Sequence, residues 1–86
     1  MTYLACSRQS YEQLTTSSAW PPAALWVSLG VLEQTELVEL RANGVAVTDF
    51  TTRIDPNEKV ALADAVDTIR EHHPDQAVWV DGSPAA

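Results

Sequence analysis

The chain has 86 residues, of which 45% are hydrophobic and 20% charged, and its 12 acidic and 5 basic residues give a formal net charge of −7. This composition indicates a folded protein rather than a disordered one, and the length fits a single compact domain over residues 1–86, with residues 82–86 as a flexible tail. The acidic balance disfavours direct binding to nucleic acid, and the single cysteine excludes an internal disulfide framework.

The sequence predicts neither contact with a membrane nor export. Residues 1–3 lack the basic start of a secretory signal, and no continuous apolar run follows them. The longest uncharged segment, residues 13–32, begins with polar residues and is broken by Pro21-Pro22, so it has too few apolar residues for a membrane span. Together with the lone Cys6, these features fit a cytoplasmic protein.

The N-terminal part predicts a strand followed by a weak helix. Residues 2–6 carry the aromatic and aliphatic side chains that favour a strand. Residues 10–13 match a capping box and predict a short helical piece through Leu14. The run of threonine and serine at residues 15–18 forms helices poorly, so this piece is expected to be short.

Residues 23–34 fit two different structures. Leu25, Leu29 and Leu32 have helical spacing after a proline suited to a first turn, but the apolar residues between 25 and 31 also alternate as they do in a strand. We favour the helix, because a strand would leave residues 33–34 as a turn without a typical turn residue.

Asn43-Gly44 predicts a hairpin that pairs residues 35–42 with residues 45–50, since a two-residue turn with positive φ at both positions strongly prefers this dipeptide. Every second residue of the two strands would then lie on the same face of the sheet. The segment of the chain after this hairpin is expected to lead into a long helix.

That helix is predicted to begin with Asp55 as the N-cap and Pro56 at the first helical position, and to end near His72 because Pro74 cannot continue it. Residues 77–81 predict a strand that returns parallel to residues 45–50 through a right-handed crossover. The buried stripe of the helix is predicted to contain the following residues: Leu62, Val66, Ile69 and His73.

These elements predict an α+β fold, a two-layer sandwich in ferredoxin-like βαββαβ order with the helices on one face of a mostly antiparallel sheet. In the alternative, an extra strand replaces the first helix. The second half, with its Asn-Gly turn, capped helix and Ala-Val-Trp-Val-Asp strand, resembles in pattern the periplasmic domains of TolR-like energy-transducing proteins. Those domains follow a membrane helix that this sequence does not predict, so we assign no family.

Two surfaces are candidates for binding a partner. Asp64, Asp67 and Glu71 lie at i, i+3 and i+7 and are expected to form an exposed acidic ridge. If the helices cover one face only, Trp79 would lie on the open face of the sheet together with Leu37, Phe50 and Tyr3, where large apolar side chains can anchor a partner. Alternatively, the N-terminal segment covers that face.

No cofactor, metal or catalytic group is predicted. His72 and His73 point about 100° apart on a helix and lack further ligands, even with Asp75 nearby. Cys6 has neither the glycines nor the arginine spacing of a phosphatase loop, and we expect a buried structural thiol. Exposed carboxylates are poor acids at neutral pH.

We therefore expect a small acidic protein, not an enzyme, that inhibits or modulates a larger partner by occupying a basic surface on it. Phage and mobile-element accessory proteins that act on nucleic-acid-handling complexes are the analogous class. The alternatives are a homodimer that associates through the open sheet face and, less favoured, a small metal-binding protein or enzyme.

Overall fold

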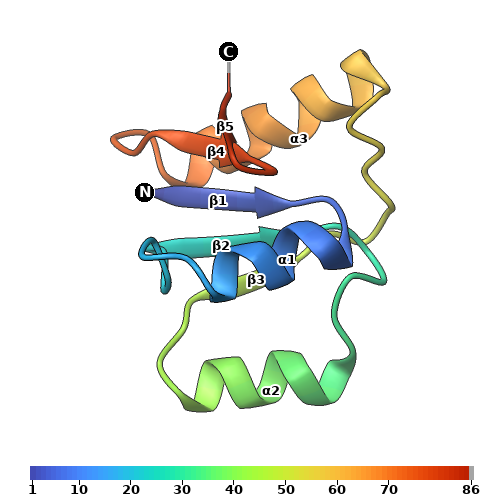
Figure 1. Cartoon of the computed structure of the whole chain (residues 1–86). Helices are drawn as coiled ribbons and strands as arrows, with labels where there is room; N and C mark the ends of the chain where they lie inside the picture. The colour runs from blue at the N-terminus through green and yellow to red at the C-terminus, as the bar shows by residue number, and fades with distance from the viewer. Residues whose placement is uncertain (86) are drawn as a thin grey trace.

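Over residues 1–85 the protein is a small α+β molecule with three helices and one mixed five-stranded sheet (Figure 1). The computed structural model describes residues 1–85. In this part of the chain no helix has the length and apolarity needed to cross a membrane. The elements, in chain order, are β1 (Thr2–Ala5), α1 (Arg8–Thr15), β2 (Ala24–Val27), α2 (Gln34–Ala42), β3 (Val47–Asp49), α3 (Lys59–His72), β4 (Val78–Val80) and β5 (Ser83–Pro84).

The strand order is β3-β2-β1-β4-β5, in which the first four strands are parallel and β5 is antiparallel to β4. The two central strands, β1 and β2, are buried along their whole length. A central parallel strand is covered on both faces, which is why β2 is a run of consecutive apolar residues rather than an alternating pattern.

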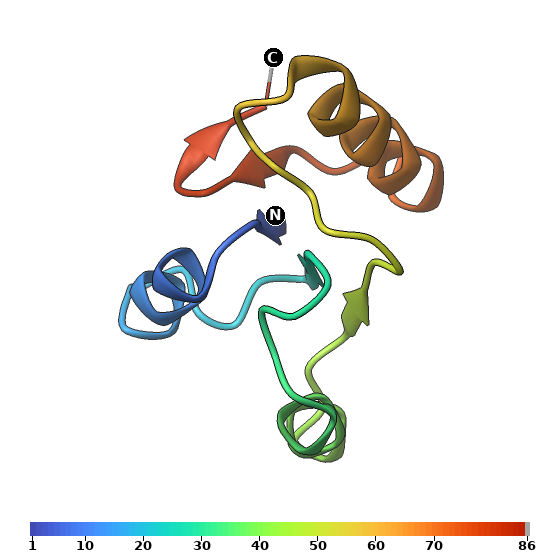
Figure 2. The same cartoon turned by 90° about the vertical axis from the view of Figure 1, so that its right-hand side faces the viewer.

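Helices cover both faces of this sheet. Along β1 and β2, successive side chains enter two separate hydrophobic clusters, since neighbouring residues of a strand point to opposite faces. One cluster contains Leu14 of α1 and Leu37 of α2, and the other contains Val66 and Ile69 of α3. Figure 2 accordingly shows α1 and α2 on one side of the sheet and α3 on the other, as in doubly wound sheets.

The α+β class is confirmed, but the ferredoxin-like order is not. The prediction of a mostly antiparallel sheet is wrong, because β1 pairs in parallel with both β2 and β4 and β2 pairs in parallel with β3. The prediction of helices on one face is also wrong. The chain extends the sheet from β1 through β2 to β3, and α3 then carries it back to place β4 on the other side of β1.

The predicted hairpin around Asn43-Gly44 is wrong, because residues 34–42 form α2. Gly44 has φ +84, its N–H donates to the Arg41 carbonyl at 3.1 Å, and the Val45 N–H donates to the Leu40 carbonyl at 2.9 Å. These two bonds form the Schellman motif that ends many helices. The positive φ of Gly44 thus ends a helix instead of forming a hairpin turn. The resemblance to TolR-like domains included that hairpin, so it loses this part of its pattern.

The preference for a helix over residues 23–34 is also wrong. Residues 24–27 form β2, and residues 28–33 are a loop that leads to α2. The N-terminus of α2 explains why residues 33–34 need no turn residue: the Glu36 carboxylate accepts from the Glu33 N–H at 3.1 Å, as in a capping box.

Two predicted boundaries shift at α1 and α3. α1 begins at Arg8, earlier than predicted, because the Ser7 side chain accepts from the Ser10 N–H at 3.1 Å as an N-cap. Asp55 is not the N-cap of α3. Its carboxylate accepts from the Asn57 N–H within a turn, and α3 begins at Lys59.

The predicted end of α3 at His72 and the strand within residues 77–81 are confirmed. The predicted pairing of this strand with residues 45–50 is wrong, because β4 pairs with β1 and two strands separate it from β3. Of the expected tail, residues 83–84 pair with β4 as β5, and Ala86 lies outside the described residues.

Candidate functional site

The outer side of α3 carries the acidic ridge, which is formed by Asp64, Asp67 and Glu71. All three residues are exposed, whereas Ala65 and Ile69 on the opposite side of the helix are buried in the core. A helix of 14 residues is about 21 Å long, so the ridge extends over roughly half of that length. The structure thus places these three predicted site residues together on one accessible stripe.

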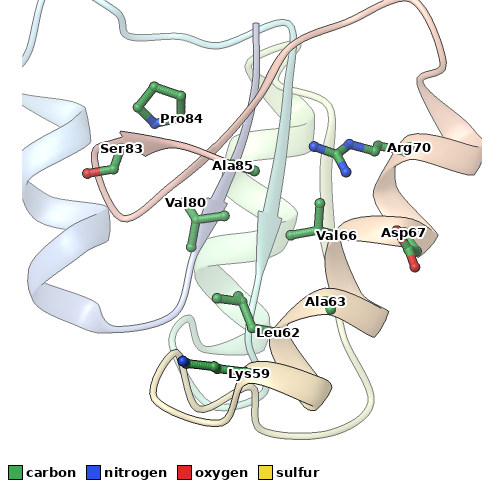
Figure 3. Close-up of a pocket in the computed structure, with 10 residues that line it drawn as sticks. All are labelled: Lys59, Leu62, Ala63, Val66, Asp67, Arg70, Val80, Ser83, Pro84 and Ala85. Atoms are coloured by element: carbon green, nitrogen blue, oxygen red, sulfur yellow. The ribbon is translucent and has the colours of Figure 1, made fainter.

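A groove of about 530 Å³ lies between α3 and the β4–β5 hairpin. In Figure 3, Leu62 and Val66 extend from α3 toward Val80, Lys59 and Arg70 stand near the two ends, and Asp67 points away from the space between them. Most of its surface is therefore apolar, with charge at its edges. The residues that line it are Lys59, Leu62, Ala63, Val66, Asp67, Arg70, Val80, Ser83, Pro84 and Ala85.

The sequence does not predict this groove, because residues 82–86 are expected to form a flexible tail. The available signal was Asp81-Gly82, a dipeptide that favours a two-residue hairpin turn. Asp81 has φ 48 and Gly82 has φ 89, and Val80 pairs with Ser83 across the turn. The resulting hairpin forms one wall of the groove.

The other predicted anchors do not lie together on an open sheet face. Leu37 belongs to α2 and is only 2% exposed, within the cluster that also contains Tyr3. Trp79 packs half-buried against the same cluster, but Phe50 packs against the opposite one, where its ring lies 5.3 Å from the ring of Trp26. The premise of an open face that carries all four side chains is therefore wrong.

The environment of Cys6 disfavours the reactive thiolate. Burial, followed by the nearby carboxylates of Asp81 and Asp55, raises the pKa of the thiol from 9.0 to about 12. The Cys6 N–H also donates to Asp81 Oδ1 at 2.9 Å, which holds that carboxylate beside the sulfur. A thiol in these surroundings is a weak nucleophile at neutral pH.

His72 and His73 pack against an aromatic ring. Their ring centroids lie 5.3 and 6.1 Å from Trp26, and His72 Nδ1 lies 2.9 Å from the Thr68 carbonyl oxygen. Within residues 1–85, no group of three or more histidine, cysteine, aspartate or glutamate side chains is arranged to hold a metal ion.

A second concavity, of about 480 Å³, lies where the loops after β1, β2 and β3 meet. Ligands of doubly wound sheets bind at this edge. Here Arg8 forms ion pairs with Glu12 at 3.2 Å and with Glu36 at 2.7 Å, and Arg53 lies over Gly30. The positive charge of Arg8 is thus partly neutralised by these carboxylates. The thiol that lines this concavity is that of Cys6, whose pKa is raised.

The ridge and the groove, which share α3, are therefore the strongest candidates for recognition in the described part of the chain. Both place side chains of defined chemistry on an accessible surface. No known protein family, curated protein or solved structure matches the chain.

Proposed function

We propose that the protein is a small acidic binding module that inhibits or modulates a larger partner by occupying a basic surface on it. The observation that supports this proposal is the ridge of three exposed carboxylates on α3, in a chain with a formal net charge of −7. By analogy with acidic accessory proteins of phages and mobile elements, the proposed partner is a nucleic-acid-handling protein, whose basic surface complements the ridge.

The ridge would act mainly on the rate of association. Exposed ion pairs contribute about 0–1 kcal/mol each to stability, because water and salt screen them. A surface of one sign nevertheless steers an oppositely charged partner over distances comparable to the Debye length, about 8 Å at physiological salt. Affinity then has to come from apolar contacts next to the ridge.

The competing functions have less support. Dimerisation through an open sheet face requires Trp79, Phe50 and Leu37 on one surface. Leu37 is instead buried in the cluster against which Trp79 packs, and Phe50 packs against the cluster on the other face of the sheet. A role in catalysis or metal binding relied on Cys6, His72 and His73. The thiol has a raised pKa and the two imidazoles lie beside Trp26, which is consistent with structural roles.

The test is a comparison of two triple variants that both raise the formal net charge from −7 to −4. The ridge variant is Asp64→Asn with Asp67→Asn and Glu71→Gln. The control variant neutralises exposed acids on α1, α2 and β3: Glu12→Gln, Glu39→Gln and Asp49→Asn.

A partner isolated by affinity capture from the source organism would be purified, and association rates would be measured by stopped flow over a range of salt concentrations. We expect the ridge variant to associate more slowly and with a weaker salt dependence than the control, because only the ridge faces the partner. Equal rates for the two variants would contradict the proposal.

A further inference from the structure

The second concavity, at the carboxyl ends of the parallel strands, carries charges of both signs. It is lined by the loops after β1, β2 and β3, and its volume of about 480 Å³ lies within the range of about 300–1,000 Å³ typical of small-molecule sites. The chain extends the sheet from β1 to β3 and then returns to place β4 on the other side of β1. In sheets of this kind, ligands bind outside the carboxyl ends of the strands, next to such a reversal. The position of the concavity therefore favours a small ligand.

Arg53 provides the positive charge of this concavity. Its Nη2 lies 3.7 Å from the position that a Cβ atom on Gly30 would occupy, so the guanidinium extends over the loop after β2. Arg8, the other arginine in the lining, is already paired with two glutamates, whereas Arg53 forms no ion pair within residues 1–85. A guanidinium can donate two parallel hydrogen bonds to one carboxylate. An acidic group of a ligand is therefore expected at this side.

A buried hydroxyl beside the same loop supports that placement. Ser28 lines the concavity although it is only 3% exposed, and its oxygen accepts from the N–H of Ile54, the residue after Arg53, at 2.7 Å. Among the described residues no acceptor receives the proton of this hydroxyl. A hydroxyl can donate one hydrogen bond as well as accept, and buried polar groups usually find partners. The carboxylate of a ligand would supply the acceptor.

Asp55 provides the negative charge. Its carboxylate accepts from the Asn57 N–H at 2.9 Å, but in the described part of the chain it forms no ion pair, not even with Arg53 two residues before it. Burial is the largest cause of the raised pKa of Cys6, and the charges of Asp81 and Asp55 add to it, so the electrostatic potential beside the thiol is negative. A cationic group of a ligand is expected at this side.

The remaining lining favours an aliphatic body between the two charged ends. A simple anion would leave the carboxylate of the lining unmatched, and a simple cation would leave the guanidinium unmatched. A molecule with one carboxylate, one ammonium and an aliphatic side chain matches all three features. The apolar residues of the lining are Leu29, Val31, Ile54 and Pro56.

We infer that this concavity binds a free α-amino acid with an aliphatic side chain, with its carboxylate on Arg53 and Ser28 and its ammonium toward Asp55. The inference goes beyond the proposed function. Because the concavity shares no residue with the ridge or the groove, its test and the test of the proposed function can fail separately.

The probe is L-leucine, and two analogues each lack one of its charged groups: 4-methylpentanoate has no ammonium, and 3-methylbutylamine has no carboxylate. Binding to the nitrogen-15-labelled full chain is followed by backbone amide chemical shifts. We expect saturable shifts in residues 28–31 and 53–55 with L-leucine, and binding about tenfold or more weaker for each analogue, because each loses one charge-assisted contact. The absence of saturable shifts in these residues, or an analogue that binds as tightly as L-leucine, overturns the inference.

Two charge variants assign the two ends of the ligand. Arg53→Gln should weaken binding of L-leucine and 4-methylpentanoate about tenfold or more and leave 3-methylbutylamine unchanged. Asp55→Asn should weaken L-leucine and 3-methylbutylamine and leave 4-methylpentanoate unchanged, and the asparagine oxygen can still accept from the Asn57 N–H. The amide spectra of the free variants show whether they are folded.

The charge-matched controls are Lys59→Gln and Asp75→Asn, which alter exposed residues outside the concavity and should leave the binding of all three compounds unchanged. If the controls weaken binding as much as the variants in the concavity, overall charge governs binding and the inference is overturned. Inorganic phosphate is the last probe. If it binds in the concavity more tightly than L-leucine, the site is one for simple anions and the inference is likewise overturned.

Discussion

Replacement of Asp81 by asparagine should make Cys6 more reactive. In the folded chain the pKa of the thiol is raised from 9.0 to about 12, first by burial and then by the charge of Asp81 and its interaction with the sulfur. A shift of this size lowers the thiolate fraction at pH 8 about a thousandfold, and alkylation requires the thiolate. Asp81→Asn removes the charge but not the burial, so the rate should rise and still remain below that of the unfolded chain.

Asp81→Asn is expected to keep the backbone turn and the hydrogen bond that Asp81 makes. Asp81 has φ 48, and asparagine tolerates this left-handed conformation, so the turn into β5 is preserved. The amide oxygen of asparagine can still accept from the Cys6 N–H, as Asp81 Oδ1 does at 2.9 Å. The change therefore acts on electrostatics rather than on the fold.

The assay is the rate of iodoacetamide alkylation between pH 7 and 10, followed by mass spectrometry, for the folded protein and for the same protein in denaturing urea. Asp75→Asn, which removes the charge of an exposed carboxylate elsewhere on the surface, is the control. The expected order of rates is wild type, then Asp81→Asn, then the unfolded chain. The reasoning is refuted if the folded wild type reacts as fast as the unfolded chain, or if Asp81→Asn is no faster than wild type.

The same pKa shift makes the stability of the fold depend on pH. The folded state holds the thiol proton more tightly than the unfolded state, so this contribution is fully present below pH 9.0 and is lost as pH rises toward 12. Urea unfolding at increasing pH should therefore show a steeper loss of stability for the wild type than for Cys6→Ala. Parallel curves for the two proteins would contradict this expectation.

Two further predictions concern the fold that supports the candidate site. Ser28→Ala should lower the free energy of unfolding by about 1–3 kcal/mol in urea titrations, because the buried Ser28 hydroxyl accepts from the Ile54 N–H at 2.7 Å and alanine leaves that donor unpaired. Arg41→Ala should cause self-association that increases with concentration, measured by light scattering, because Arg41 Nε and Nη2 donate to the Val47 carbonyl at 3.3 and 3.0 Å and so cover the free edge of the sheet. Arg53→Ala is its charge-matched control, and equal association of these two arginine variants would show that the edge contact is unimportant.

Some features of the fold could be predicted because they depend only on residues close together in the sequence. The end of α3 at His72 follows from Pro74, which lacks an N–H and clashes with a preceding helical turn. The burial of Val66 and Ile69 follows from their helical spacing, and the exposure of the ridge follows from the same period on the other side of the helix. These predictions hold because they depend on backbone geometry within a few residues.

The two Asx-Gly dipeptides show where local chemistry is insufficient. Asp81 and Gly82 both have positive φ, as a hairpin turn requires, and turn β4 into β5. At Asn43-Gly44 only the glycine has positive φ, Asn43 has φ −88, and the dipeptide ends α2. The flanking segments differ. Residues 34–42 form a helix that buries Leu37 in the core, whereas residues 78–80 form a strand that pairs with β1. Local conformational freedom permits either use, and packing with distant residues selects one.

By itself, the sequence determined that the chain is acidic, that α3 ends before Pro74, and that Asp64, Asp67 and Glu71 share an exposed stripe, because these properties depend on composition and on spacing along one helix. Only the tertiary structure decided that the sheet is largely parallel, that helices cover both of its faces, and that the β4–β5 hairpin stands beside α3 to form the groove. Strand order and the pairing of distant surfaces depend on which buried faces pack together across the whole chain, and a central strand such as β2 has the same local pattern as a buried helix.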